Sequence, residues 1–344
     1  MERYIAVDSG KFATKIAWAN NDFDGFQKGQ FRTRMSRGNF EDDAIENGTY
    51  VCEIDGVVMK IGNGAAQDAD LETSKKSEIH KYCTLLAIAL VVSRDEIDDV
   101  YCAIGIPVGE YKVVEKRNEY RDYVLPDGPI TVKYKMQKGG IEIRTFKIIK
   151  KFVYPESAGG IYLDIKRNMD TAAVIDIGNL NINATYFANK EPDFTCSTTS
   201  ELGGQILISG LAAELSSAFT RCDERVVGKL LKGPLDERYL RPVNPNPHVE
   251  EESRLLINDY LLNHVKKIRR ICDSKGWALD YMPVTFIGGT SALLRNEIQS
   301  VFGDEAFIPE KPEIANALGF LRRMVAWEKE VLIPIESTSL ENSQ

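Results

Sequence analysis

The chain has 344 residues and a formal net charge of −8, and 43% of its residues are hydrophobic. This length suffices for two domains, or one unusually large one, with a substantial core. The acidic balance excludes general electrostatic attraction to nucleic acid, so we expect no direct nucleic-acid partner. The most apolar run, residues 84–92, is too short to span a bilayer, so we expect no membrane partner.

The six cysteines are scattered without a Cys-x-x-Cys pair, and the three histidines lack paired spacing. These patterns argue against a zinc site and against a disulfide framework. We expect no signal peptide, because the given sequence enters a predicted strand directly. We therefore expect a cytoplasmic protein.

The first predicted element is a β-hairpin. Two strand-like runs, residues 4–7 and 14–18, flank the turn Asp8-Ser9-Gly10-Lys11. Glycine lets the backbone approach an anion closely, and the lysine adds positive charge. The turn could therefore bind a phosphate while Asp8 faces a metal-bound water. The alternative is an ordinary hairpin turn, because short Asp-x-Gly turns are common.

The next part of the chain alternates strands and helices. Strands are predicted at 25–30, 50–61, 100–107, 130–135 and 141–149, and helices at 80–93 and 111–123. A further helix is predicted at 155–168. Pro155 suits its first turn, and the carboxylate of Glu156 is favoured there by the helix dipole.

The opening pattern then returns. A strand at 171–177 ends in Val-Ile-Asp176-Ile-Gly178, a turn follows at 179–181, and a strand returns at 182–187. Both copies read strand, Asp, one residue, Gly, strand. The repetition predicts a duplicated architecture in which each half contributes one phosphate hairpin.

The second half continues with glycine-rich segments. Gly203-Gly204 opens a helix running toward Arg221, and such a helix N-terminus can receive a phosphate or a nucleoside. A long amphipathic helix is predicted at 250–275. A strand at 283–287 runs into Gly288-Gly289-Thr290-Ser291, another strand ends at 308–309, and a helix follows at 313–329.

Five segments, residues 8–11, 155–159, 176–178, 288–291 and 315–319, stand in an order that resembles the actin, Hsp70 and sugar-kinase superfamily. There the corresponding parts are phosphate loop 1, a connecting helix, phosphate loop 2, the adenosine loop and a second connecting helix. The resemblance implies an α/β fold of actin-like (ribonuclease H-like) duplicated mixed-sheet domains around a nucleotide cleft. The expected domain I comprises residues 1–157 and 322–344, and domain II comprises residues 158–321.

Within this superfamily, residues 6–15 are similar to the Asp-x-Gly-x-x-x-x-Lys opening of the bacterial plasmid-segregation ParM/StbA (Alp) group. The likeness implies an ATPase that uses ATP and Mg²⁺, polymerises with itself into filaments, and segregates plasmid DNA through a DNA-binding adaptor protein. GTP remains open as the nucleotide. The alternatives on this fold are a small-molecule (sugar-type) kinase, a cell-shape actin homologue and an Hsp70-type chaperone. We expect no peptide-binding domain after the ATPase region, which argues against the chaperone, and no aspartate stands out as the base for a sugar hydroxyl.

The resemblance also implies roles for individual residues. Asp8 and Asp176 would hold Mg²⁺ through water, and Glu156 would position or activate the attacking water. The expected nucleotide-binding residues are Ser9, Gly10, Lys11, Gly178, Asn179, Gly203, Gly204, Gly288, Gly289, Thr290 and Ser291.

Phosphate loop 2 departs from the family pattern. It usually reads Asp-x-Gly-Gly-x-Thr, whereas residues 176–181 here read Asp-Ile-Gly-Asn-Leu-Asn. The contacts to the γ-phosphate and the rate of hydrolysis are therefore open, while the pair Asp8 and Asp176 is retained.

Overall fold

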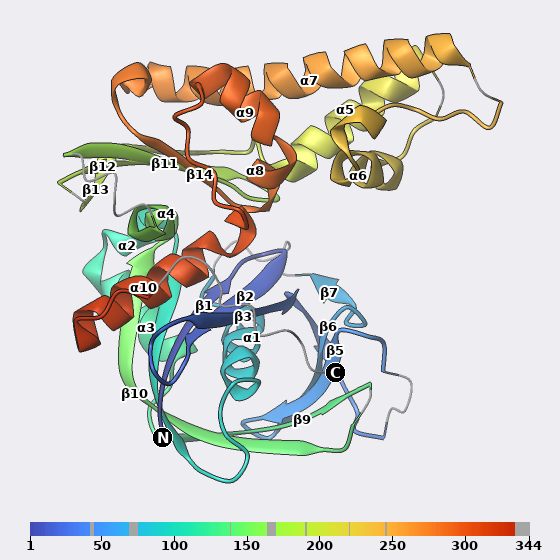
Figure 1. The fold of residues 1–344 in the computed structure, drawn as a ribbon. Helices are drawn as coiled ribbons and strands as arrows, with labels where there is room; N and C mark the ends of the chain where they lie inside the picture. Colours follow the sequence, from blue (N-terminus) through green and yellow to red (C-terminus); the bar gives the residue numbers. More distant parts are fainter. Residues whose placement is uncertain are drawn as a thin grey trace. The chain divides into compact units, whose positions relative to one another are not determined.

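A computed structural model describes residues 1–41, 45–68, 75–137, 139–163, 170–189, 191–219, 221–244 and 246–333, apart from the side chains of residues 67 and 68. The chain forms two compact units (Figure 1). Unit 1 comprises residues 1–163 and 314–344, and unit 2 comprises residues 164–313. The tail from residue 334 lies outside the described residues.

These boundaries differ from the expected ones at 157/158 and 321/322. Helices α4 (Ala158–Leu163) and α10 (Ala315–Lys329) pack against each other within unit 1. Their backbones meet at two glycines: a Cβ added to Gly319 would lie 2.1 Å from the carbonyl oxygen of Gly159. Because side chains are absent at this contact, the two helices approach closely and both belong to unit 1.

Unit 1 is built on a sheet of ten strands in the order β3-β2-β1-β8-β10-β9-β5-β6-β4-β7. The strands are β1 (Glu2–Ser9), β2 (Ala13–Ala19), β3 (Phe26–Arg32), β4 (Arg34–Arg37), β5 (Thr49–Ile54), β6 (Val57–Gly62), β7 (Gln67–Asp68), β8 (Asp98–Ile106), β9 (Pro129–Met136) and β10 (Glu142–Pro155). β1, β8 and β10 run parallel, and the pairs β1–β2 and β2–β3 are antiparallel. The sheet is therefore mixed, and the carboxyl ends of its three parallel strands share one edge.

The core of unit 1 forms around helix α1 (Glu78–Ala89), which packs against strands of the sheet and against α3 (Val114–Val124), as Figure 1 shows. Ten of its twelve residues are buried, so the helix is apolar on nearly all sides. The short helix α2 (Val108–Tyr111) follows β8. This packing stabilises the sheet in which the parallel strands β1, β8 and β10 end at one edge.

Unit 2 has a four-stranded sheet in the order β13-β12-β11-β14. Its strands are β11 (Thr171–Ile177), β12 (Ile182–Ala188), β13 (Glu191–Ser200) and β14 (Val284–Ile287). Its helices are α5 (Gly204–Ala218), α6 (Glu224–Lys232), α7 (Pro247–Ser274), α8 (Gly289–Leu293) and α9 (Arg295–Phe302). The long helix α7 packs against α5 and α9, and Figure 1 shows all three on one side of the sheet. None of the described helices is both long and apolar enough to cross a membrane.

The two sheets contain the same four-strand pattern. In β3-β2-β1-β8 and in β13-β12-β11-β14, two antiparallel pairs are followed by one parallel pair. The hairpins at 2–19 and 171–188 occupy equivalent places. The duplicated architecture predicted from the two Asp-x-Gly turns is present in the strand order.

Several expected elements differ from the structure. Pro155 ends strand β10 and pairs with Ile106, and the helix begins only at Ala158; the remainder of the predicted helix, residues 164–168, lies outside the described residues. Around Ile308, a single bridge between Thr285 and Phe307 replaces the predicted strand. Strand β13 was not predicted, because its sequence is rich in Thr and Ser and lacks an apolar face.

Candidate functional site

Two of the predicted catalytic carboxylates lie at the same edge of the unit 1 sheet. Val7 of β1 and Val153 of β10 both pair with Ile104 of the central strand β8. Asp8 follows Val7 directly, and Glu156 follows the last residue of β10. The parallel register therefore delivers both carboxylates to the carboxyl edge of the sheet, where ligands bind in open α/β sheets.

Two lysines neutralise these carboxylates. Lys75 Nζ forms an ion pair with Glu156 Oε1 and lies 3.9 Å from Asp8 Oδ1. Lys15 pairs with Asp8 across the hairpin, and its Nζ lies 3.4 Å from Asp8 Oδ2. We call these four residues the Asp8 cluster. Its two negative and two positive charges sum to zero.

The protonation of the cluster follows from its charges. Burial alone would raise the pKa of Asp8, but Lys15 and Lys75 outweigh burial and hold this pKa below its usual range. Burial alone would lower the pKa of Lys75, but Glu156 and Asp8 raise it above its usual range. Asp8 is therefore a carboxylate and Lys75 an ammonium, which suits a site that handles phosphate and a divalent cation.

The turn between β1 and β2 is held by local hydrogen bonds. The Gly10 N–H donates to the carbonyls of Asp8 and Ala13, at 3.0 and 3.1 Å. A Cβ on Gly10 would lie 2.9 Å from Lys15 Nζ, so the absent side chain makes room for this ammonium. Lys11 is half-buried and forms no ion pair within the described part of the chain. Its charge is thus available to an anion at the turn.

The hydroxyl groups beneath this turn form a chain. Ser9 Oγ lies 3.2 Å from Thr14 Oγ1, which lies 2.9 Å from Thr33 Oγ1. All three residues are buried. Ser9, predicted to bind nucleotide, therefore engages its hydroxyl within the protein and fixes the base of the turn.

The backbone around Glu156 is fixed on both sides. The N–H of Glu156 donates to Ile106 O at 2.8 Å, and the N–H of Ser157 donates to Asn316 Oδ1 at 3.1 Å. Ser157 has a φ of 70°, a left-handed conformation that is costly for a residue with a side chain. Glu156 precedes α4 and lies outside its first turn, so the helix-dipole explanation predicted for this residue does not hold.

A buried imidazole lies near the cluster. Helix α1 carries His80, whose Nδ1 lies 3.0 Å from Ser77 Oγ and whose Nε2 has no hydrogen-bond partner among the described residues. Burial lowers the pKa of His80 to about 3, and the charges of Lys75 and Lys11 act in the same direction. His80 is therefore neutral and adds no charge to the site.

The unit 2 residues also meet at a carboxyl edge. Asp176 of β11 pairs in parallel register with Ile287 of β14, so Gly178 and Gly288 follow neighbouring strand ends. A Cβ on Gly288, whose φ is 88°, would lie 2.3 Å from Asp176 Oδ1 and 2.5 Å from Ile177 O. Only glycine fits here, because the carboxylate of Asp176 occupies the space of the missing side chain.

The glycines at the start of α5 pack on the β11–β12 turn. The N–H groups of Gly204 and Gln205 donate to Gly178 O and Asn179 O, at 2.9 and 2.6 Å. A Cβ on Gly203 would lie 2.4 Å from the carbonyl carbon of Leu180. Two of the first amide donors of α5 are thus used within the protein, and the glycine pair is explained by this contact.

The segment after β14 is similarly engaged. Thr290 Oγ1 donates to Gly178 O at 2.9 Å, and Ser291 Oγ donates to Ile287 O at 2.6 Å. Both residues are buried. A Cβ on Gly289 would lie 3.9 Å from its nearest neighbour, Glu313 Cβ. An added side chain at Gly289 would therefore make only an ordinary van der Waals contact, unlike one at Gly288.

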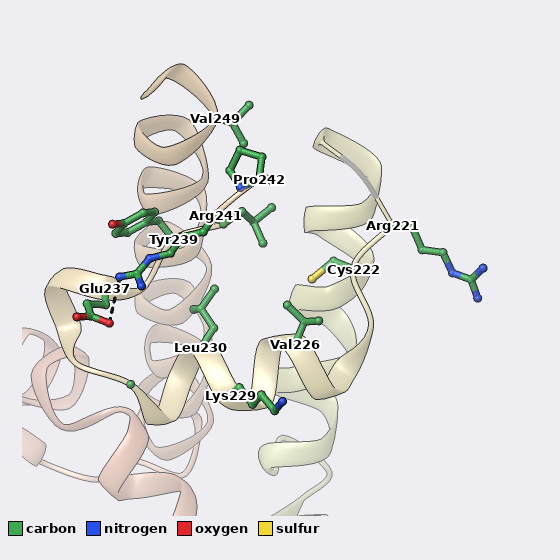
Figure 2. Close-up of a pocket in the computed structure, with 12 residues that line it drawn as sticks. Arg221, Cys222, Val226, Lys229, Leu230, Glu237, Tyr239, Arg241, Pro242 and Val249 are labelled. Atoms are coloured by element: carbon green, nitrogen blue, oxygen red, sulfur yellow. Dashed lines mark ion pairs between the residues drawn. The ribbon is translucent and has the colours of Figure 1, made fainter. Parts of the chain in front are cut away.

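An apolar cleft of about 450 Å³ lies in another part of unit 2. Figure 2 shows Val226 and Leu230 of α6 facing this cleft, and Arg241 paired with Glu237 at 3.0 Å on its rim. None of the residues predicted to bind nucleotide lines it. The cleft is therefore separate from the two Asp-x-Gly edges.

The structure adds Lys15, Lys75 and His80 to the neighbourhood of Asp8. Lys15 could have been found from the hairpin register, which places it opposite Asp8. Lys75 and Lys76 are indistinguishable in the sequence, yet Lys75 is 6% exposed, whereas the side chain of Lys76 is 44% exposed and pairs with Glu119. No local pattern separates these two lysines.

Comparisons with known proteins agree with this architecture. Residues 6–159 match the N-terminal domain family of actin-like proteins. The chain is 22% identical to the Alp12 filament protein, with a TM-score of 0.71 over 95% of this chain and 99% of that one. An archaeal actin homologue is 18% identical, with a TM-score of 0.73 over 94% of this chain and 98% of that one, and it was also solved with ADP. Bacillus thuringiensis ParM, solved with ATP, is 14% identical, with a TM-score of 0.66 over 95% of this chain and 99% of that one. No curated protein matches the sequence.

Proposed function

We propose that this chain, which has the fold of the bacterial actin-like proteins and carries their N-terminal domain, is an ATPase that assembles into nucleotide-dependent filaments. The observation that carries the proposal is the Asp8 cluster: the buried carboxyl groups of Asp8 and Glu156 paired with the buried Lys75 and the partly buried Lys15 at the carboxyl edge of a mixed sheet. The Alp12 relative was solved as a filament, and two other relatives were solved with ADP or ATP.

The cluster has the groups that phosphoryl transfer to water requires. This reaction needs charge neutralisation and a positioned water more than covalent participation by the protein. Lys11 and Lys15 would neutralise the phosphates, and the Gly10 and Gly178 turns would face them. Glu156 would orient the attacking water and accept its proton.

The residues also fit a hydrated Mg²⁺. Asp8 is ionised, but its two oxygens face ammonium groups at 3.4 and 3.9 Å, which favours contact through water over direct coordination. Asp8 and Asp176 would hold the ion's water shell. Bound Mg²⁺ would supply positive charge to the phosphates as they separate.

The unit 2 residues would contribute mainly backbone. Gly203, Gly204, Gly288 and Gly289 would flank the adenosine, while the Thr290 and Ser291 hydroxyls hold the loops that carry them. These contacts leave the choice between ATP and GTP to be measured. Residues Asn179 and Asn181 stand where a second glycine and a threonine are usual, so the rate of hydrolysis is also to be measured.

The proposed biological role is plasmid segregation. Filaments of this chain would bind plasmid DNA through a DNA-binding adaptor protein, because a chain with a net charge of −8 is poorly suited to bind DNA itself. Self-association through an interface that does not close would produce an open polymer.

The test is direct. Purified protein with ATP and Mg²⁺ should release phosphate, increase light scattering above a critical concentration, and form filaments in negative-stain microscopy; GTP is run in parallel. Flat scattering at all concentrations would remove the filament proposal. ATP consumption that requires an added sugar would replace it with a sugar-type kinase.

A further inference from the structure

We propose that Lys75 is a positioning residue for hydrolysis: it holds Glu156 by one carboxylate oxygen and leaves the other to meet the attacking water. This inference rests on the proposed ATPase function and deepens it. The substrate it concerns is the terminal phosphate of a nucleoside triphosphate together with one water molecule.

The first step is the burial of the lysine. Lys75 is 6% exposed, and an isolated ammonium at such a site would be strongly destabilising. The lysine is retained there by two carboxylates, Glu156 in direct ion-pair contact and Asp8 at 3.9 Å. A buried ion pair is a poor source of stability compared with apolar side chains, so its presence calls for another role.

The second step is the division of the Glu156 carboxylate. Lys75 pairs with Oε1, and no described side chain forms an ion pair with Oε2. Asp8 has a second cation in Lys15, whereas Lys75 is the one cation that pairs with Glu156 in the described part of the chain. The buried Tyr120 lies near Glu156, but its hydroxyl donates to Gly105 O at 3.2 Å and so does not hold the Glu156 carboxylate. The orientation of Glu156 therefore depends on Lys75.

The third step concerns the backbone on both sides of Glu156, which is fixed in place. Hydrogen bonds to Ile106 and Asn316 fix the chain on both sides of Glu156, and Ser157 is held in a left-handed conformation. Fixing the backbone alone leaves the side-chain torsions of a glutamate free. Lys75 arrives from a separate segment, just before α1, and fixes the carboxylate itself.

In the reaction, the water oxygen forms a bond to the γ-phosphorus while the bond from that phosphorus to the ADP oxygen breaks. One water proton passes to Oε2 of Glu156 and then to solvent. Oε1 remains paired with Lys75 throughout. Lys75 itself exchanges no proton and acts through the geometry and charge of Glu156.

The experiment compares steady-state ATP hydrolysis and equilibrium binding of ADP with Mg²⁺ in five proteins: wild type, Lys75→Met, Glu156→Gln, the double variant, and Lys76→Met as the matched control. Lys75→Met should lower kcat about 10- to 100-fold while the Kd for ADP changes less than about threefold. Lys76→Met should match wild type, because Lys76 pairs on the surface with Glu119.

The double variant separates positioning from a merely structural role. If Lys75 acts through Glu156, removing it after Glu156→Gln should lower kcat no further. The double variant also carries no unpaired buried charge from this pair, so it should fold even if Lys75→Met is destabilised. Thermal unfolding of all five proteins monitors this point.

Four results would overturn the inference. Turnover of Lys75→Met within about twofold of wild type would remove it, as would additive losses in the double variant. Loss of ADP binding together with turnover would make Lys75 a nucleotide ligand instead. Wild-type protein without any ATP hydrolysis would refute the proposed function, and the inference with it, whereas the first three results leave the ATPase proposal intact.

Discussion

The two units use one strand pattern for different purposes. In each, a hairpin with an Asp-x-Gly turn lies beside a parallel strand, and the functional candidates follow the strand ends. Unit 1 gathers charge at this edge: Asp8 faces two lysines, one of which also pairs with Glu156. Unit 2 gathers backbone instead, with glycines that permit three loops to touch.

This difference indicates that duplication of a scaffold does not duplicate its chemistry. The charged edge of unit 1 suits reacting groups and phosphates. The glycine-rich edge of unit 2 suits a flat ligand held by main chain and by shape. Variants of the two edges should therefore fail in different ways.

The largest effect is expected at Asp8. Asp8→Ala leaves Lys15 without its anion and Lys75 with one anion fewer at a buried site, so the free energy of unfolding should fall by about 4 kcal/mol. Urea unfolding without nucleotide measures this. Asp55→Ala is the control, because Asp55 is exposed and pairs only at the surface with Lys81; it should cost less than about 1 kcal/mol. Equal losses at both sites would contradict the special place given to unit 1's charges.

A steric effect is expected at the unit 2 edge. Gly288→Ala would place a Cβ 2.3 Å from Asp176 Oδ1 on a backbone with a φ of 88°, and should cost about 3 kcal/mol. Its neighbour Gly289 serves as control, because a Cβ there would make only an ordinary van der Waals contact, 3.9 Å from Glu313 Cβ. Gly10→Ala in unit 1 would place a Cβ 2.9 Å from the movable end of Lys15 and 3.1 Å from the backbone oxygen of Ala13, a milder clash on a backbone without a positive φ, and should cost about 1 kcal/mol. A Gly10 variant as unstable as the Gly288 variant would erase the contrast between the edges.

Acid should weaken unit 1 through His80. The pKa of His80 is lowered to about 3, chiefly by burial, whereas the pKa of an unfolded histidine is about 6.5. The stabilisation that neutral His80 gives the folded protein is fully present above the pKa of the unfolded state. It decreases as pH falls toward the pKa of the folded state, by about 1.4 kcal/mol per pH unit. From pH 7 to pH 5 the loss should be about 2 kcal/mol, measured by urea unfolding. His80→Gln should remove this part of the pH dependence.

His264 provides the comparison in unit 2. Burial lowers the pKa of His264 too, but its Nε2 lies 3.1 Å from Leu202 O, which favours the protonated form. His264→Gln should therefore change the pH dependence less than His80→Gln does. The reverse order would contradict this account of the two imidazoles.

The smallest effect concerns helix starts. Asp223 caps α6 by accepting from the N–H groups of Arg225 and Val226, at 2.9 and 3.0 Å, whereas Ser77 before α1 makes no such bond. Asp223→Ala should cost about 1 kcal/mol. Glu224→Ala, one residue on, is the control: it loses an exposed hydrogen bond from Gln205 and should cost less than about 0.5 kcal/mol. A neutral Asp223 variant would show that packing alone fixes α6.

Local patterns in the sequence predicted most of the scaffold. The hairpins at β1–β2 and β11–β12, the buried strand β8, and the long helix α7 all carry strong periodicity or turn signals. Strand β13 could not be predicted because it lacks an apolar face. Helices α6, α8 and α9 could not be predicted because they are too short to show a clear periodicity. The boundaries of unit 1 depend on the contact of α4 with α10 at Gly159 and Gly319, 160 positions apart. The small residues of both helices indicate close packing against another backbone, but the sequence does not identify the partner.

The candidate site divides in the same way. Asp8 and Glu156 could be proposed from motifs, and the structure brings them to one sheet edge. Lys75 could not, because its burial depends on tertiary packing around α1 and not on its neighbours in sequence. The glycines of unit 2 were predicted for nucleotide binding, and the structure gives them a packing role as well.

The contact between Gly159 and Gly319 has a consequence for biosynthesis. Unit 1 is assembled from two stretches of chain, and the second, which includes α10, leaves the ribosome after unit 2. Unit 2 is continuous, so it can complete its core while α10 is still being translated. The hydrogen bond that Asn316 accepts from Ser157 forms only after α10 docks. Nascent chains therefore acquire the finished surroundings of Glu156 only after all of unit 2 has been synthesised.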